Sequence, residues 1–203
     1  MTGKIKLNAA SGGGSVSLQA PSSSGNDRII TLPTSADGTV LTTTNPKAGN
    51  IIQVVNVEKT DVASTSSTSF SDISGMSASI TPSSSSSKIL VTVFLGQFSC
   101  EDAIYLTLCL ADGTNLLGGD SVSGAETSST GAYSGGNSTG EAYYGANPAT
   151  LVKLHSPNTT SSVTYKIRWR VNVGTGYFNR NSSDTNQYKI RCASTITLME
   201  VAA

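Results

Sequence analysis

The segment Val163–Val173 alternates without interruption between apolar and polar side chains. A helix cannot produce this pattern, because the apolar side chains on one helix face recur every three or four residues. The segment is therefore predicted to be a half-buried antiparallel strand. Its apolar face consists of Val163, Tyr165, Ile167, Trp169, Val171 and Val173, and its polar face carries the cations Lys166, Arg168 and Arg170.

Shorter runs with the same period of two residues occur along the rest of the chain. Ala103–Leu110 is apolar on both faces, which is typical of a strand in the middle of a sheet. Ile89–Leu95 alternates as well, and Phe94 and Phe98 are expected on its opposite face. The remaining runs are Ile51–Val57, Met76–Ile80, Thr150–His155 and Ile190–Val201.

No window of the sequence has the apolar spacing of a helix. The β-branched and aromatic residues gather in the runs, and Ser, Gly and Asn separate one run from the next. Residues 49–203 are therefore predicted to form an all-β knob. An antiparallel β-sandwich or jelly roll with about seven to nine strands fits this length.

Residues 1–48 are predicted to be an extended, Gly/Ser-rich arm. Three β-like pieces, Lys4–Leu7, Ser15–Leu18 and Arg28–Leu32, are each too short to fold alone. We expect them to become ordered only by pairing with another chain or by lying along a partner surface. The candidate anchoring residues are Lys4, Ile5, Leu7, Ile29, Ile30 and Leu32.

Residues 113–148 are rich in glycine and tyrosine and are predicted to be one long loop. Tyrosine among Gly, Ser and Asn is typical of adaptable binding loops, because it offers contact area with little side-chain entropy to lose. A solvated loop without a ligand has the same composition, so both interpretations stand. The candidate contact residues are Tyr133, Tyr143, Tyr144 and Tyr177.

Charge and hydropathy exclude several classes of protein. Lys plus Arg and Asp plus Glu are both 13, so no basic excess favours nucleic acid. No run of apolar residues is long enough to span a membrane, and residues 1–14 lack the apolar stretch of a secretory signal.

The charges are segregated along the chain. Residues 49–148 hold two cations and nine anions, whereas residues 149–203 hold seven cations and two anions. These charges pair either within the fold or between subunits.

The reactive side chains do not form a known catalytic or metal-binding pattern. His155 is the only histidine, and Ser121 follows Gly-Asp as in some serine proteases but lacks the glycines that should come next. Glu101 and Asp102 are adjacent, so on a strand they would point to opposite faces. Calcium at Asp112 or Asp120 has no motif behind it. The sequence therefore predicts neither an enzyme nor a bound cofactor.

The three cysteines, Cys100, Cys109 and Cys192, have no metal-like spacing. An odd number leaves at least one thiol outside any disulfide within the chain. We expect all three to be reduced and buried, and to behave as small apolar side chains.

A succession of low-complexity motifs runs through residues 49–203. In chain order the motifs are Gly49–Val55, Ser64–Ser71, Ile80–Val91, Ala111–Thr114, Leu117–Asp120, Ser156–Thr160 with Tyr165, and Ala193–Glu200. This succession resembles the C-terminal domain of tail-fibre-like virion proteins of marine bacteriophages, especially those that infect cyanobacteria. In the arm, Ile30–Pro33 followed by Asp37–Thr43 is similar to a repeated unit found before such domains.

The resemblance implies a non-enzymatic structural protein, trimeric, carried on a virion that is assembled in the host cytoplasm. Its arm would contact other virion proteins, and its knob would bind a glycan or a protein of the host surface. The apolar second faces of Ala103–Leu110 and Leu90–Phe98 also favour a homotrimer, because a two-layer sandwich need not bury them. The arm of 48 residues is shorter than a fibre shaft. A short fibre, a head spike and a capsid or tail decoration protein that only stabilises the particle all remain open.

Overall fold

The computed structural model describes residues 4–8, 11–13, 15–19, 25, 46–100, 102–117, 131–134, 148–182 and 190–203. The chain divides into two compact units, Met1–Val40 and Leu41–Ala203. The knob was predicted to begin at residue 49, and its first strand begins at Ile51.

The first unit contains a hairpin of two antiparallel strands, β1 (Lys4–Asn8) and β2 (Ser15–Gln19). Gly12 and Gly13 both have positive φ in the turn, a conformation that glycine adopts without steric strain. The prediction that these pieces become ordered only against another chain or a partner surface is therefore wrong for two of the three, because they pair with each other. The third piece, residues 28–32, lies outside the described residues.

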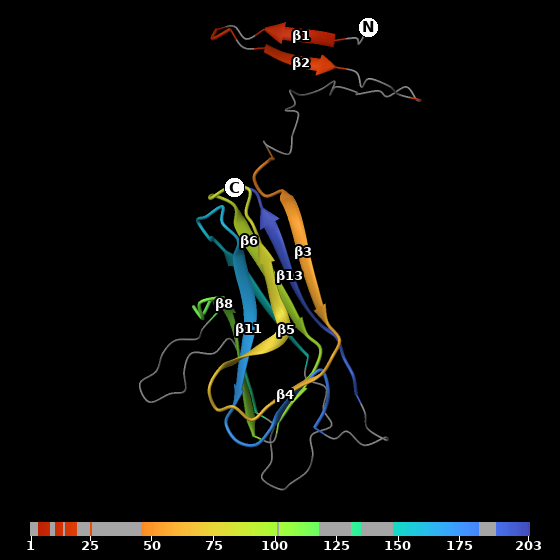
Figure 1. Cartoon of the computed structure of the whole chain (residues 1–203), viewed down its shortest axis with the longest axis vertical. Coiled ribbons are helices and arrows are strands. Elements are labelled where there is room, and N and C mark those ends of the chain that lie inside the picture. The colour runs from red at the N-terminus through yellow and green to blue at the C-terminus, as the bar shows by residue number, and fades with distance from the viewer. Residues whose placement is uncertain are drawn as a thin grey trace. The chain divides into compact units, whose positions relative to one another are not determined.

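In the described residues, the second unit consists of seven long strands and four short ones, all antiparallel (Figure 1). The long strands are β3 (Ile51–Lys59), β5 (Ser71–Ile80), β6 (Lys88–Leu95), β8 (Ala103–Leu110), β10 (Ala149–His155), β11 (Val163–Val171) and β13 (Ser194–Val201). The short strands are β4 (Ala63–Thr65), β7 (Phe98–Ser99), β9 (Gly131–Ser134) and β12 (Gly176–Phe178). The all-β prediction is confirmed, and each of the seven predicted runs overlaps one long strand.

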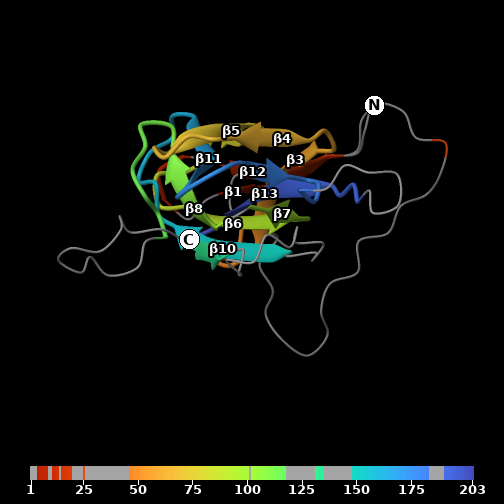
Figure 2. The same ribbon diagram turned by 90° about the horizontal axis from the view of Figure 1, so that it is seen from below.

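Two four-stranded sheets face each other, with the orders β10-β6-β13-β3 and β5-β11-β8-β9 (Figures 1 and 2). The three short strands β4, β12 and β7 form a separate, smaller sheet in the order β4-β12-β7. In the two large sheets β3 pairs with β13, β5 with β11, β6 with β10 and β8 with β9. The first of the eight strands in chain order thus pairs with the last, and each later pair lies inside the one before it. This nesting of antiparallel pairs is the pattern of a jelly roll. As predicted, β8 lies inside its sheet, between β11 and β9.

The core lies between the inner faces of the two large sheets. Alternate residues of β6, β11 and β13 are almost completely buried there, as period-two alternation requires. The buried residues on these strands include Ile89, Val91, Val93, Leu95, Tyr165, Ile167, Trp169, Ile196 and Leu198. The apolar alternation of the sequence therefore correctly located the core.

Three local predictions are wrong. Val173 is 61% exposed, because β11 ends at Val171 and the chain bends before Gly174, which has positive φ. Phe98 lies in the core and not beside Phe94, because β6 ends at Leu95 and a new strand begins at Phe98. The segment 113–148 is not one uninterrupted loop, because β9 occupies Gly131–Ser134 and pairs with β8.

A buried carboxylate holds the serine run that follows Pro82. Glu200, at the end of β13, accepts hydrogen bonds from the backbone N–H of Ser83 at 2.7 Å and from its hydroxyl at 2.6 Å. Gln53 donates a third hydrogen bond to the same carboxylate. Burial by itself raises the pKa of Glu200, but the hydrogen bonds from Ser83, Gln53 and Ser87 outweigh it and lower the pKa.

Candidate functional site: the outer faces of the two sheets

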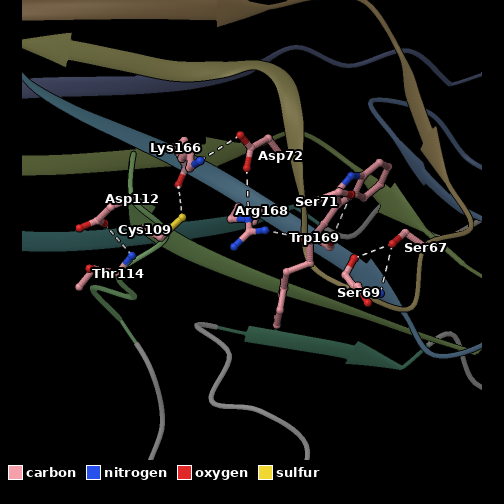
Figure 3. A network of polar contacts seen from close by, with 11 residues as sticks. Ser67, Ser69, Ser71, Asp72, Cys109, Asp112, Thr114, Lys166, Arg168 and Trp169 are labelled. Atoms are coloured by element: carbon pink, nitrogen blue, oxygen red, sulfur yellow. Dashed lines mark hydrogen bonds and ion pairs between the residues drawn. The ribbon is translucent and has the colours of Figure 1, made fainter.

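The outer face of the β5-β11-β8-β9 sheet carries a network of charged side chains (Figure 3). Lys166 Nζ lies 3.0 Å from one oxygen of Asp72, and Arg168 Nε lies 3.2 Å from the other. Arg168 also donates a hydrogen bond of 2.6 Å to the backbone carbonyl of Phe70. Asp72 belongs to the acidic part of the chain and both cations to the basic part. At this point the segregated charges therefore pair within the fold.

Arg170, the third cation of the same strand, is only 6% exposed. Its guanidinium lies 4.0 Å from the centroid of the Tyr105 ring and 5.6 Å from that of Phe70. A guanidinium that is surrounded by aromatic faces keeps favourable electrostatic contacts after it leaves water. The polar side chains of β11 therefore pack on the sheet and do not extend as a row of solvated charges.

Residues 111–117 turn back beside β8, and Asn115 forms an antiparallel bridge with Cys109. Leu116 N–H donates to the carbonyl of Leu108 at 2.9 Å, and the Thr107 hydroxyl donates to Asn115 at 2.7 Å. Cys109 is completely buried, and its thiol contacts the carbonyl of Lys166. On the second face of Ala103–Leu110, predicted to contact other subunits, Thr107 and Cys109 are buried, and Ala103 and Tyr105 are half-buried. Part of the reason is local, because the chain turns back directly after the strand and Asn115 pairs with its end.

Asp112, one of the two aspartates considered for calcium, lies in that turn. Its carboxylate accepts the Thr114 N–H at 2.9 Å, and the hydrogen bonds from Thr114 lower the pKa of Asp112. The described residues contain no group of three His, Cys, Asp or Glu side chains that could hold a metal ion. Asp120 lies outside the described residues.

The outer face of the β10-β6-β13-β3 sheet, by contrast, presents apolar side chains to solvent. Leu154, Leu90, Met199 and Val54 lie opposite one another and form a row across all four strands. Val54 is 57% exposed, Val152 54%, Leu154 49% and Phe94 44%, while Leu90 and Met199 are half-buried. We call these residues the apolar face: Val54, Leu90, Phe94, Val152, Leu154 and Met199.

Of the four candidate contact tyrosines, Tyr177 is described with its side chain. It lies in β12 and is half-buried, and the Arg180 guanidinium sits 4.2 Å from the centroid of its ring. Tyr133 lies in β9, where its backbone is opposite Ile104. Tyr143 and Tyr144 fall outside the described residues, so no common site of the four can be drawn.

Three of the six candidate anchoring residues lie in the described part of the chain. Lys4, Ile5 and Leu7 lie in β1, and Leu7 is 61% exposed. Ile29, Ile30 and Leu32 fall outside the described residues.

The residues considered for catalysis are not brought together in the described part of the chain. Ser121 and Glu101 lie outside it, and Asp102 accepts a hydrogen bond of 2.6 Å from Asn172. His155, at the end of β10, lies with Nδ1 2.9 Å from the Tyr165 hydroxyl. Burial raises the pKa of Tyr165 to about 12, so this hydroxyl keeps its proton at neutral pH.

Acidification should destabilise the protein through His155. Burial and the nearby Lys153 lower the pKa of this imidazole from 6.5, so the fold favours its neutral form. This stabilisation is complete above the unfolded pKa and is lost as pH falls through the lower folded pKa. Urea unfolding between neutral pH and about pH 5 should show the loss in the wild type and a smaller one in His155→Gln. Equal pH dependence in the two proteins would contradict this assignment.

The cysteines are free thiols, as predicted. Cys100 and Cys109 are buried, whereas Cys192 is only partly buried. Its thiol contacts the Gln97 side chain at 3.8 Å.

Among the residues that the structure describes, none belongs to a helix long and apolar enough to cross a membrane. A scan against models of known protein families finds no match for this chain. A search of curated proteins finds no match either.

Proposed function

We propose that this chain is a non-enzymatic structural protein of a bacteriophage virion. Three copies form a short fibre or spike that binds the host surface, and residues 1–48 attach it to the particle. The observation that carries the proposal is the contrast between the two sheets. One outer face carries charged side chains that pair within the chain, whereas the other leaves apolar side chains exposed. Apolar groups gathered on one surface are typical of a protein that works in an assembly.

The resemblance to fibre-like virion proteins is the reason for proposing a virion as the assembly in which this chain works. Two of the motifs that carry the resemblance, Ile80–Val91 and Ala193–Glu200, are in contact, because Glu200 accepts hydrogen bonds from Ser83. Their joint occurrence therefore has a physical reason in this fold. In such a knob the strands form the scaffold, and the loops are the segments that can vary to suit a receptor.

A decoration protein that stabilises a capsid or tail is the second candidate, and one observation favours it. The Tyr177 ring is covered on one face by the Arg180 guanidinium and is half-buried in a strand. It therefore offers less stacking surface to a glycan than a loop tyrosine would. A decoration protein needs no such surface.

The number of copies per particle distinguishes the two functions. We expect quantitative mass spectrometry of purified particles to find a few dozen copies or fewer, and immunogold labelling to place them at one vertex or on the tail. Hundreds of copies spread over the head would favour the decoration protein. Complete absence from purified particles would refute both.

A further inference from the structure

We infer that the apolar face is the surface on which a second copy of this chain packs. The inference rests on the proposed function in one respect only, namely that the chain works as an assembly of identical subunits. It adds the location of the contact, which is the outer side of β10, β6, β13 and β3.

The register of the four strands makes this face continuous. Directly opposite residues in neighbouring antiparallel strands lie on the same side of the sheet. The row Leu154–Leu90–Met199–Val54 therefore crosses the sheet without a polar interruption. The next row is Val152–Thr92–Thr197–Asn56, and the third contains Phe94 between Thr150 and Thr195. The threonines add methyl groups, so the surface between the exposed apolar side chains is only weakly polar.

The size of the face fits a weak contact between subunits. Four strands spaced about 4.8 Å apart, each about seven residues long at about 3.4 Å per residue, cover about 450 Å² of flat sheet. A standard interface buries about 800 Å² per partner, and side-chain relief raises the accessible area above the flat area. The face is smaller than an obligate interface, so association through one such face should depend on concentration.

The charges at the margins favour an identical partner. The outward positions of the four strands carry only two charged residues, Glu58 on β3 and Lys88 on β6. Glu58 lies beside Thr195, near one end of the sheet, and Lys88 lies beside Val201, near the other. A copy that packs face to face with its strands reversed brings its Lys88 to the end that carries Glu58. Opposite charges then flank the apolar centre on both sides. Such a contact has twofold symmetry, so it joins copies in pairs and is separate from the contacts within the proposed trimer.

The edge strand β10 of the same sheet is unsuited to backbone pairing with a strand of a second copy. Lys153, in the edge strand β10, lies opposite Val91, whose side chain is buried in the core. Lys153 therefore occupies an inward position of an edge strand. An inward-facing lysine on an edge strand opposes the addition of a further strand. Contact through the face avoids this residue, because the outward positions of β10 are Thr150, Val152 and Leu154.

Glutamate substitutions on and off the face test the assignment in the full chain. We expect Val152→Glu and Val54→Glu each to raise the dissociation constant at least about tenfold, because the new carboxylate would be buried against apolar groups. Val173→Glu is the matched control, since Val173 is 61% exposed and lies in a bend outside the sheet. Sedimentation equilibrium over a range of protein concentrations gives the constants. Circular dichroism of each protein confirms that it is folded.

Charge exchange provides a second measurement that does not depend on the valines. Glu58→Lys and Lys88→Glu should each weaken association, and the double exchange should restore it. If Val152→Glu fails to fold, Val152→Thr retains the branched side chain and should weaken association by a smaller factor.

Each outcome has a defined meaning. Equal association of the wild type, Val152→Glu and Val54→Glu would overturn the assignment of the face and leave the proposed virion function intact. A wild type that stays monomeric throughout would also overturn it, and would contradict the three-copy fibre of the proposed function as well. Loss of association in both face variants, together with absence of the chain from virions, would refute the proposed function and not the contact.

Discussion

Replacing Asn179 by alanine should destabilise the knob more than almost any other exchange of one polar side chain. Asn179 is completely buried, and its amide donates hydrogen bonds to the carbonyls of Lys59 at 2.8 Å and Asp61 at 3.1 Å. Its side-chain oxygen accepts a third, at 2.6 Å, from the Ser194 hydroxyl. Alanine leaves two buried polar groups, the Lys59 carbonyl and the Ser194 hydroxyl, without this partner, at about 1–3 kcal/mol each before relaxation. It also removes the partly buried contact to the Asp61 carbonyl. We expect a loss of about 4 kcal/mol in the free energy of unfolding.

Asn158→Ala provides the matched control for this prediction. Both asparagines have positive φ, 57° at Asn179 and 53° at Asn158, so alanine introduces similar backbone strain at either position. Asn158 is exposed, and its replacement should cost only the strain, about 1 kcal/mol. The two variants should differ by about 5–10 °C in thermal midpoint. Equal midpoints would mean that the buried hydrogen bonds of Asn179 contribute nothing.

Gly96→Ala should also cause a large loss of stability, through steric overlap. Gly96 follows β6, and a Cβ atom at this position would overlap the backbone carbonyl oxygen of Ala193 and lie 2.7 Å from Cys192 Cβ. A backbone atom cannot move aside as the end of a long side chain can. The Gly96 N–H also donates to the Ser194 hydroxyl at 2.9 Å, so a shift of this backbone disturbs the hydrogen bonds of Asn179. We expect a loss of at least about 3 kcal/mol.

Gly75→Ala is the control for this prediction, because it introduces backbone strain without steric overlap. Gly75 has φ of 82°, but the atoms nearest to an added Cβ belong to the Lys59 side chain, at 3.6 Å or more. This variant should lose only about 1–2 kcal/mol from the left-handed conformation. Urea unfolding of both variants measures the difference. If Gly75→Ala were the less stable of the two, strain would outweigh overlap and the prediction for Gly96 would be wrong.

The parts of the fold that follow from local pattern were predicted well. Val163–Val171 is a strand whose alternate residues are buried, and Ala103–Leu110 lies inside its sheet, both as the alternation indicated. Side chains alternate between the two faces of any strand, so a single segment contains this information. The alternation within one strand did not predict which outer face of the sandwich would stay exposed. Of the two faces proposed for subunit contact, the one on β8 is buried or half-buried within the chain, whereas the one on β6 leaves Phe94 exposed.

The residues that the sequence did not identify share one property, which is that their partners are distant in the chain. Asn179 contacts Lys59 and Ser194, and Glu200 contacts Ser83. Arg170 was expected on a polar face, but it packs on Tyr105 and Phe70. Asn, Glu and Arg occur mostly at protein surfaces, so their type alone gives no reason to expect burial.

By itself, the sequence determined the class of the fold and the membership of the core. The period-two alternation and the absence of helical spacing were sufficient, because burial of apolar groups dominates the free energy of folding and depends only on which side chains share a face. Tertiary structure alone decided which outer face remained open and where the polar side chains found partners. Those outcomes depend on strand order and on the path of the chain after each strand, which bring together residues far apart in the sequence.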